Sequence, residues 1–200
     1  MFHDAPPPAA CTRIRAALEV RGRGPVLAAK LGRLLRTLAT SKPGGTFLCL
    51  GEGAGEAAAW ILDGMDLSSG LVALVRESDE EVALKRELER DLRVSVHRQD
   101  ARAFLLDVSA HRFDLIADLT PGERPAIVRL GLNLLRPGGL YVASRAGNTL
   151  HAVFAQDAPE SDPSAPRLAV DAFGVAHLDA GDVVLITRRP ERNRPRRRAR

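Results

Sequence analysis

Aromatic residues, cysteines and long apolar runs are all scarce in this sequence. Phenylalanine, tryptophan and tyrosine make up 4% of the 200 residues. No apolar run approaches the roughly 20 residues that a membrane-spanning helix needs. The two cysteines, Cys11 and Cys49, match no metal or redox spacing, and the first residues lack the basic and apolar regions of a secretion signal. We therefore expect a cytoplasmic protein without disulfides or membrane spans.

The composition nevertheless supports a folded domain with an unusual tail. At 45% hydrophobic residues, the chain can bury a core built mainly from Leu, Val and Ala. Residues 188–200 hold eight arginines and one glutamate, so the rest of the chain is mildly acidic despite a net charge of +4. Prolines and the absence of apolar periodicity predict a disordered Arg-rich tail over residues 189–200. It is either a solubilising tail or a salt-sensitive contact for nucleic acid or another polyanion.

Short apolar runs alternate with amphipathic segments through most of the chain. Helical spacing predicts two leading helices broken at residues 22–25, with Pro25 in the first turn of the second helix. Strands are expected over residues 46–50, 71–75, 94–96, 113–117 and 140–143, and helices over residues 54–62, 79–91, 101–106 and 125–135. Residues 167–176 and 183–187 are expected to form a terminal hairpin. The pattern predicts an α/β fold with a mostly parallel sheet, an antiparallel C-terminal hairpin and helices on both faces.

The domain boundaries follow from the same pattern. We expect an N-terminal arm and helix over residues 1–24, one folded domain over residues 25–188, and the tail over residues 189–200. A surface loop rich in Pro, Ser and Asp is expected over residues 156–166.

A glycine-rich turn joins the first predicted strand to the helix that follows it. Gly51, Gly53 and Gly55 permit positive φ angles and close approach of a ligand to the backbone beside a helix N-terminus. In an open parallel sheet, ligands bind at such turns where the strand order reverses. The spacing G-x-G-x-G differs from the G-x-G-x-x-G of dinucleotide sites, which makes a nicotinamide dehydrogenase a weak alternative. A purely structural turn is also an open alternative.

Four motifs in order resemble those of class I S-adenosylmethionine (SAM)-dependent methyltransferases. They are Phe47-Leu48-Cys49-Leu50-Gly51-Glu52-Gly53-Ala54-Gly55, Gln99-Asp100-Ala101, Phe113-Asp114-Leu115-Ile116-Ala117-Asp118 and Leu134-Leu135-Arg136-Pro137-Gly138-Gly139-Leu140. The resemblance covers roughly residues 24–188 and is strongest to the small O-methyltransferases of the catechol and caffeoyl-CoA type. It implies a Rossmann-like seven-stranded methyltransferase sheet, with the terminal hairpin supplying the antiparallel strand.

The resemblance also implies which residues bind the cofactor. The candidate cofactor-binding residues are Gly51, Glu52, Gly53, Gly55, Arg76, Glu77, Asp100 and Ala101. Asp100 would contact the adenine amine, or it caps the helix that starts at Ala101. Either Arg76 or Glu77 falls where the family places an acid on the ribose hydroxyls. Cys49 stands where the family has the acid that holds the cationic methionine end of SAM, and Glu52 is a possible replacement.

The metal site of the catechol type does not match this sequence. Its later acid–asparagine pair falls on Ser144 and Arg145, and an arginine side chain cannot ligate a hard cation. No metal is therefore expected. Asp118 is a candidate general base or substrate contact, or a turn residue before Thr120. Arg145, Asn148 and His151 follow the fifth predicted strand and are weaker candidates for substrate contact.

These observations lead to three hypotheses about function. The first is a metal-independent SAM-dependent methyltransferase, an O-methyltransferase acting on a small-molecule acceptor. The second is a non-catalytic relative with impaired SAM binding that serves a structural or partner-binding role. The third is an RNA methyltransferase that uses the basic tail. The oligomeric state stays open, and a homodimer is one alternative.

Overall fold

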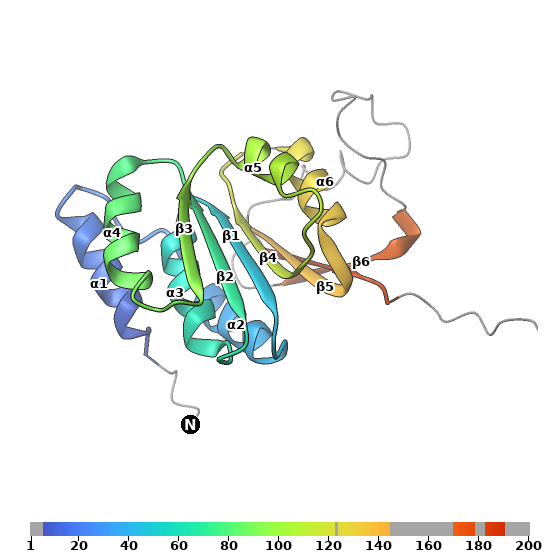
Figure 1. Cartoon of the computed structure of the whole chain (residues 1–200), viewed down its shortest axis with the longest axis horizontal. Coiled ribbons are helices and arrows are strands. Elements are labelled where there is room, and N and C mark those ends of the chain that lie inside the picture. The colour runs from blue at the N-terminus through green and yellow to red at the C-terminus, as the bar shows by residue number, and fades with distance from the viewer. Residues whose placement is uncertain (1–5, 123, 145–169, 179–182, 191–200) are drawn as a thin grey trace, which may run out of the picture.

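A computed structural model describes residues 6–122, 124–144, 170–178 and 183–190 of the chain (Figure 1). Within these residues, seven strands form one sheet in the order β3-β2-β1-β4-β5-β7-β6. The strands are β1 (Thr46–Gly51), β2 (Gly70–Val75), β3 (Val94–Arg98), β4 (Phe113–Leu119), β5 (Leu135–Ser144), β6 (Phe173–Leu178) and β7 (Val183–Arg188). The first five strands are parallel, and β7 pairs antiparallel with both β5 and β6. This confirms the predicted fold class, including the antiparallel C-terminal strands.

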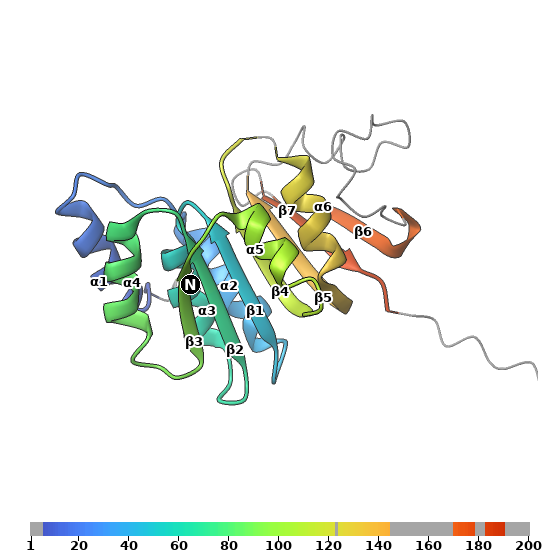
Figure 2. The same cartoon turned by 45° about the horizontal axis from the view of Figure 1, so that its top comes forward.

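Helices cover both faces of the sheet (Figure 2). They are α1 (Ala9–Glu19), α2 (Ala29–Thr40), α3 (Ala54–Gly64), α4 (Ser78–Leu88), α5 (Ala101–Asp107) and α6 (Pro125–Asn133). Alternation along β1 explains the two layers, because successive strand residues point to opposite faces. Phe47 and Cys49 join the core beneath α1 to α4, whereas Leu48 and Leu50 join the core beneath α5 and α6.

The N-terminal helix packs against the main body of the protein. Cys11, Ile14 and Leu18 of α1 are buried in the same core as α2 and α3. The domain boundary at residue 24 stays a prediction.

Helix α2 and strand β5 start at other residues than predicted. Helix α2 begins at Ala29, so the prediction that Pro25 lies in its first turn is wrong. Residues before Ala29 leave the helical path because the Val26 amide bonds to a side chain of α3. Strand β5 begins at Leu135, five residues before the predicted start at residue 140, and its pairing with β4 has a register irregularity between Phe113 and Leu115.

The C-terminal hairpin is present but shorter at its start than predicted. Its first strand, β6, begins at Phe173, and a 3₁₀ turn (Val170–Ala172) precedes it. The hairpin turn and the predicted surface loop over residues 156–166 lie outside the described residues.

The strand order reverses beside β1. The chain runs from β1 outward through β2 to β3, and then returns to place β4 on the other side of β1. Ligands of open α/β sheets bind at the carboxyl ends of strands at such a reversal. The turn that leaves β1 at Gly51 is therefore the position where this fold forms a binding crevice.

Candidate functional site

The glycine turn between β1 and α3 takes a backbone path that favours glycine. Gly51 has φ +93° and Gly53 has φ +82°, and Gly53 is the N-cap residue of α3. A Cβ atom on Gly51 would lie 2.2 Å from the Thr120 amide nitrogen, so this glycine lets β1 end close against the end of β4. Gly55 is different, because its Cβ would lie 2.5 Å from Leu84 Cδ1 of α4. Gly55 therefore permits close packing of α3 on α4.

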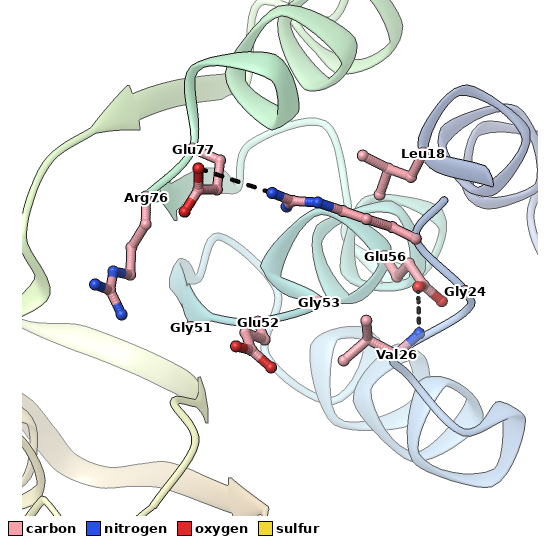
Figure 3. A pocket seen from close by; sticks show the side chains of 10 residues that line it. Leu18, Gly24, Val26, Gly51, Glu52, Gly53, Glu56, Arg76 and Glu77 are labelled. Atoms are coloured by element: carbon pink, nitrogen blue, oxygen red, sulfur yellow. Dashed lines mark hydrogen bonds and ion pairs between the residues drawn. The ribbon is translucent and has the colours of Figure 1, made fainter. Parts of the chain in front are cut away.

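A cavity of about 370 Å³ lies beside this turn (Figure 3). Its volume is within the range of about 300–1,000 Å³ that small-molecule sites usually occupy. Glycines, one leucine, one valine and five charged residues line it: Leu18, Arg23, Gly24, Val26, Gly51, Glu52, Gly53, Glu56, Arg76 and Glu77. The apolar lining residues, Leu18 and Val26, thus come from α1 and its connection to α2, which also contributes Arg23. The ends of β1 and β2 contribute Glu52, Arg76 and Glu77.

The α1–α2 connection, residues 20–28, covers one side of the cavity. The Val26 side chain faces the glycine turn, since a Cβ on Gly53 would lie 3.3 Å from Val26 Cβ. Arg23 reaches across to the end of β2, where its Nη2 lies 3.8 Å from Glu77 Oε2. The connection therefore contacts both the glycine turn and the β2 end of the cavity.

Glu56 holds the α1–α2 connection to α3. Its side chain is 1% exposed, although it lines the cavity. Glu56 Oε1 accepts a hydrogen bond from the Val26 amide at 2.9 Å, and Oε2 accepts one from Arg15 Nε at 2.6 Å. Arg15 Nη2 also donates to the Leu27 carbonyl oxygen at 2.8 Å. The carboxylate is thus paired with a guanidinium and a backbone amide.

Sequence reasoning did not single out Glu56, although a signal was present. Residues 54–62 read Ala-Gly-Glu-Ala-Ala-Ala-Trp-Ile-Leu, and Glu56 is the one charged residue among them. All but Leu62 of these residues are buried. A charged residue inside a helix segment that is otherwise apolar indicates a buried partner or a ligand contact.

Five of the predicted cofactor residues line the cavity, and three do not. Gly51, Glu52 and Gly53 lie at the turn, and Arg76 and Glu77 lie at the end of β2. Glu52, Arg76 and Glu77 are exposed. Within the described part of the chain, Arg76 makes no hydrogen bond or ion pair, so its guanidinium is available to a ligand.

Asp100 and Ala101 do not line the cavity, and neither does Gly55. Asp100 is the N-cap of α5, where its Oδ1 accepts a hydrogen bond from the Ala103 amide at 3.0 Å. The capping role that the sequence left open is therefore present. Contact of Asp100 with an adenine stays a prediction.

Asp118 lies in a buried hydrogen-bond network at the end of β4. Its side chain accepts hydrogen bonds from the Thr120 amide and hydroxyl at Oδ1, and from the Tyr141 hydroxyl at Oδ2, 2.5 Å away. Burial raises the pKa of the Asp118 carboxyl, against the lowering effect of the hydrogen bonds from Thr120 and Tyr141. Burial and the neighbouring Asp118 carboxylate raise the pKa of the Tyr141 phenol. This setting favours the turn role of Asp118, and its catalytic role stays a prediction.

The position of the missing acid on β1 is fully enclosed. Cys49 is 0% exposed, and burial raises the pKa of its thiol far above the usual range, so the side chain is neutral. Any negative charge that compensates a cationic ligand must therefore come from elsewhere on the cavity wall. Glu52 and Glu77 are exposed there and can reach a ligand.

The structure adds two findings on metals and membranes. Among the described residues, no group of three or more His, Cys, Asp or Glu side chains could hold a metal ion. Ser144 ends β5, whereas Arg145, Asn148 and His151 lie outside the described residues. No helix in the described ranges is long and apolar enough to cross a membrane.

Comparison with known proteins gives relatives in both sequence and structure, although no family model matches the chain. A protein of Mycobacteroides abscessus named "Putative O-methyltransferase" is 29% identical over 187 residues, which cover 84% of this chain and 82% of that protein. A protein of the same name from Mycobacterium sp. (strain JLS) is 31% identical over 130 residues, which cover 62% of this chain and 59% of that protein.

A solved structure covers nearly the whole chain. The O-methyltransferase from Bacillus cereus, crystallised in complex with S-adenosylhomocysteine (SAH), has a TM-score of 0.66 at 17% identity, covering 92% of this chain and 91% of that one. The chain therefore has the fold of the class I SAM-dependent methyltransferases. Its sequence relatives are O-methyltransferases by name, which confirms the resemblance predicted from the sequence.

Proposed function

We propose that this protein is a SAM-dependent methyltransferase that transfers a methyl group to an oxygen of a small-molecule acceptor without a metal ion. The observation that carries the proposal is the cavity beside the glycine turn, at the carboxyl ends of β1 and β2 where the strand order reverses. The O-methyltransferase relatives and the SAH complex of the Bacillus cereus enzyme support the choice of cofactor.

The residues around the cavity fit a cationic adenosyl compound. SAM, when bound, supplies a methyl group on a positively charged sulfur. Gly51 and Gly53 present backbone to the cavity without a side chain. Glu52 and Glu77 supply negative charge at the cavity, and Glu77 would accept hydrogen bonds from ribose hydroxyls once Arg23 moves away. Methyl transfer depends mainly on placing the acceptor in line with the sulfonium, so the chain's main task is positioning.

Calorimetric titration with SAM and SAH tests the cofactor assignment. We expect the wild-type protein to bind both, and Gly53→Ala to weaken binding at least about tenfold. The reason is that an alanine at φ +82° is strained, and its Cβ would lie 3.3 Å from Val26. Gly70→Ala is the matched control, because nothing lies within 4 Å of its Cβ position. No binding of SAM or SAH at millimolar concentration would reject the assignment.

Turnover is tested separately from binding. We expect SAH to form when SAM is incubated with a panel of phenolic and other hydroxylated acceptors, and we expect EDTA to leave the rate unchanged. Loss of turnover in EDTA would refute metal independence.

A non-catalytic SAM-binding protein is the second candidate function. The observation that favours it is the burial of Asp118, whose carboxylate is 4% exposed and bonded to Thr120 and Tyr141 rather than open to the cavity. Binding of SAH without turnover on any acceptor would support this candidate over the first.

Three further predictions concern the location of the protein, its oligomeric state and its contact with polyanions. A cytoplasmic location and a homodimer remain expectations from the sequence. Contact with RNA or another polyanion depends on the Arg-rich tail, of which residues 191–200 lie outside the described part of the chain.

A further inference from the structure

The buried carboxylate of Glu56 lies among groups that would otherwise bind an anion. Val26 supplies a backbone amide and Arg15 supplies a guanidinium, each within 2.9 Å of a Glu56 oxygen. Glu56 is also in the first turn of α3, where the helix dipole favours negative charge. A guanidinium, a backbone amide and a helix N-terminus are donors that proteins use to bind free carboxylates.

Glu56 and Val26 both line the cavity, whereas Arg15 does not and reaches it only through its bond to the Glu56 carboxylate. Removing that carboxylate would therefore open the place where the two donors meet to a ligand in the cavity. With Glu56 in place, both donors are occupied by the protein's own carboxylate. A second carboxylate brought by a ligand would find no free donor there and would be repelled by the Glu56 charge.

We propose that Glu56 is a specificity-determining residue that takes the place of a ligand carboxylate. The site then recognises adenosyl compounds through their nucleoside and their positive charge, and the Arg15 and Val26 donors contribute no binding energy to the carboxylate of the amino-acid part. This inference rests on the proposed function, because it assumes that an adenosyl compound enters the cavity.

An alternative role for Glu56 is to bind the ammonium group of the ligand, and it predicts the opposite effect of removing Glu56. If its carboxylate accepted the ammonium group of the ligand, removing Glu56 would weaken ligands that carry the amino-acid part. Two features favour the first role. Glu56 is 1% exposed, and each of its oxygens already accepts a hydrogen bond. Glu52 and Glu77 are the more exposed acids on the cavity wall, and they are better placed to meet a cation.

The experiment compares two ligands that differ by the amino-acid part. SAH carries it, and 5′-methylthioadenosine does not. For the wild-type protein, we expect calorimetry to give similar dissociation constants for the two. For Glu56→Ala, we expect SAH to gain at least about tenfold over 5′-methylthioadenosine, because the Arg15 and Val26 donors become free for its carboxylate. Asp63→Ala is the matched control, because Asp63 is another acid of α3 and pairs with Arg36. In this variant, the ratio of the dissociation constants of SAH and 5′-methylthioadenosine should stay at the wild-type value.

Glu56→Ala is expected to be less stable than the wild type. A second measurement therefore tests the same inference through the melting temperature. Sodium formate, compared with sodium chloride at equal ionic strength, should raise the melting temperature of Glu56→Ala saturably and more than that of the wild type or Asp63→Ala. Formate would then occupy the position of the missing carboxylate. Glu56→Gln, which keeps the side-chain volume without the charge, should also shift preference toward SAH.

The outcomes separate this inference from the proposed function. Weaker binding of SAH relative to 5′-methylthioadenosine in Glu56→Ala, or no specific effect of formate, would overturn the role proposed for Glu56 and leave the cofactor assignment standing. Failure of SAM, SAH and 5′-methylthioadenosine to bind the wild type and both Glu56 variants would overturn the proposed function, and this inference with it.

Discussion

Replacing Tyr141 with phenylalanine should destabilise the protein, and more so at neutral than at acid pH. The Tyr141 hydroxyl donates to Asp118 Oδ2 at 2.5 Å, and both side chains are buried, at 0% and 4% exposure. Phenylalanine keeps the ring packing but leaves Oδ2 without this donor. When Asp118 is ionised, losing a hydrogen bond to a charged group costs about 1.5–3 kcal/mol, whereas a neutral hydrogen bond is worth about 0.5–1.5 kcal/mol.

The sign of the pH dependence follows from the raised pKa of Asp118. Burial raises the pKa of this carboxyl above its unfolded value of 3.8, so the folded state binds the proton more tightly. Proton binding by Asp118 therefore stabilises the folded state below pH 3.8, and this stabilisation is lost as the pH rises through the pKa of Asp118 in the folded state. Tyr141 lowers the folded pKa, so its removal raises that value further. The cost of Tyr141→Phe should grow across this window, from about 1 kcal/mol toward about 2–3 kcal/mol.

Urea denaturation followed by fluorescence can measure this cost. The chain has one tryptophan, Trp60, which is fully buried and reports on unfolding. Unfolding free energies of wild type and Tyr141→Phe should be compared from acid to mildly alkaline pH. Asp118→Asn is the background control, because an amide has no charge for Tyr141 to stabilise, and there the cost should be small and independent of pH. A cost that is equal at all pH values in both backgrounds would refute the reasoning.

Three further substitutions test packing, burial and capping. Gly32→Ala should destabilise by about 1–3 kcal/mol in denaturation experiments, because its Cβ would lie 2.3 Å from Trp60 Nε1, whereas Gly70→Ala, with open space around it, should be neutral. Cys49→Asp should cost about 3–5 kcal/mol, because it places an unpaired carboxylate at a position with 0% exposure; equal melting temperatures for Cys49→Asp and Cys49→Ala would contradict this. Asp100→Ala should cost about 1 kcal/mol and Asp100→Asn almost nothing, since asparagine also caps helices; a large loss in Asp100→Asn would show that capping is not the main role.

The sheet was predictable from the sequence because its strands are short apolar runs separated by amphipathic helices. Each of the seven strands overlaps a segment that the pattern predicted as a strand, although β5 starts five residues before its predicted start and β6 starts six residues after its predicted start. The errors lie at segments whose path depends on distant contacts. Residues 24–28 are not part of α2, and the Val26 amide bonds to Glu56, thirty positions away, a contact that no local propensity of Pro25 could indicate.

The candidate site was predictable in part for a similar reason. The glycine turn, Arg76 and Glu77 follow the ends of β1 and β2, and strand ends can be located from the pattern. The sequence did not reveal the apolar wall of the cavity, because Leu18 and Val26 come from a helix and a connection whose placement depends on tertiary packing. It also left both roles open for Asp100, and only the structure shows the capping bond to Ala103.

One physical principle applies to both Cys49 of β1 and Glu56 of α3: a buried carboxylate needs a partner. The side chain of Cys49 lies in the core beneath α1 to α4 at 0% exposure, so a carboxylate at this position would lose its contact with water. Glu56 is buried to a similar degree but lies where Arg15 and the Val26 amide can pair with it. A carboxylate is stable at position 56 because α1 brings a guanidinium to it, whereas a carboxylate at the fully enclosed position 49 would bear the cost of burial. The Glu56 carboxylate therefore holds the α1–α2 connection, which forms one wall of the cavity, to α3.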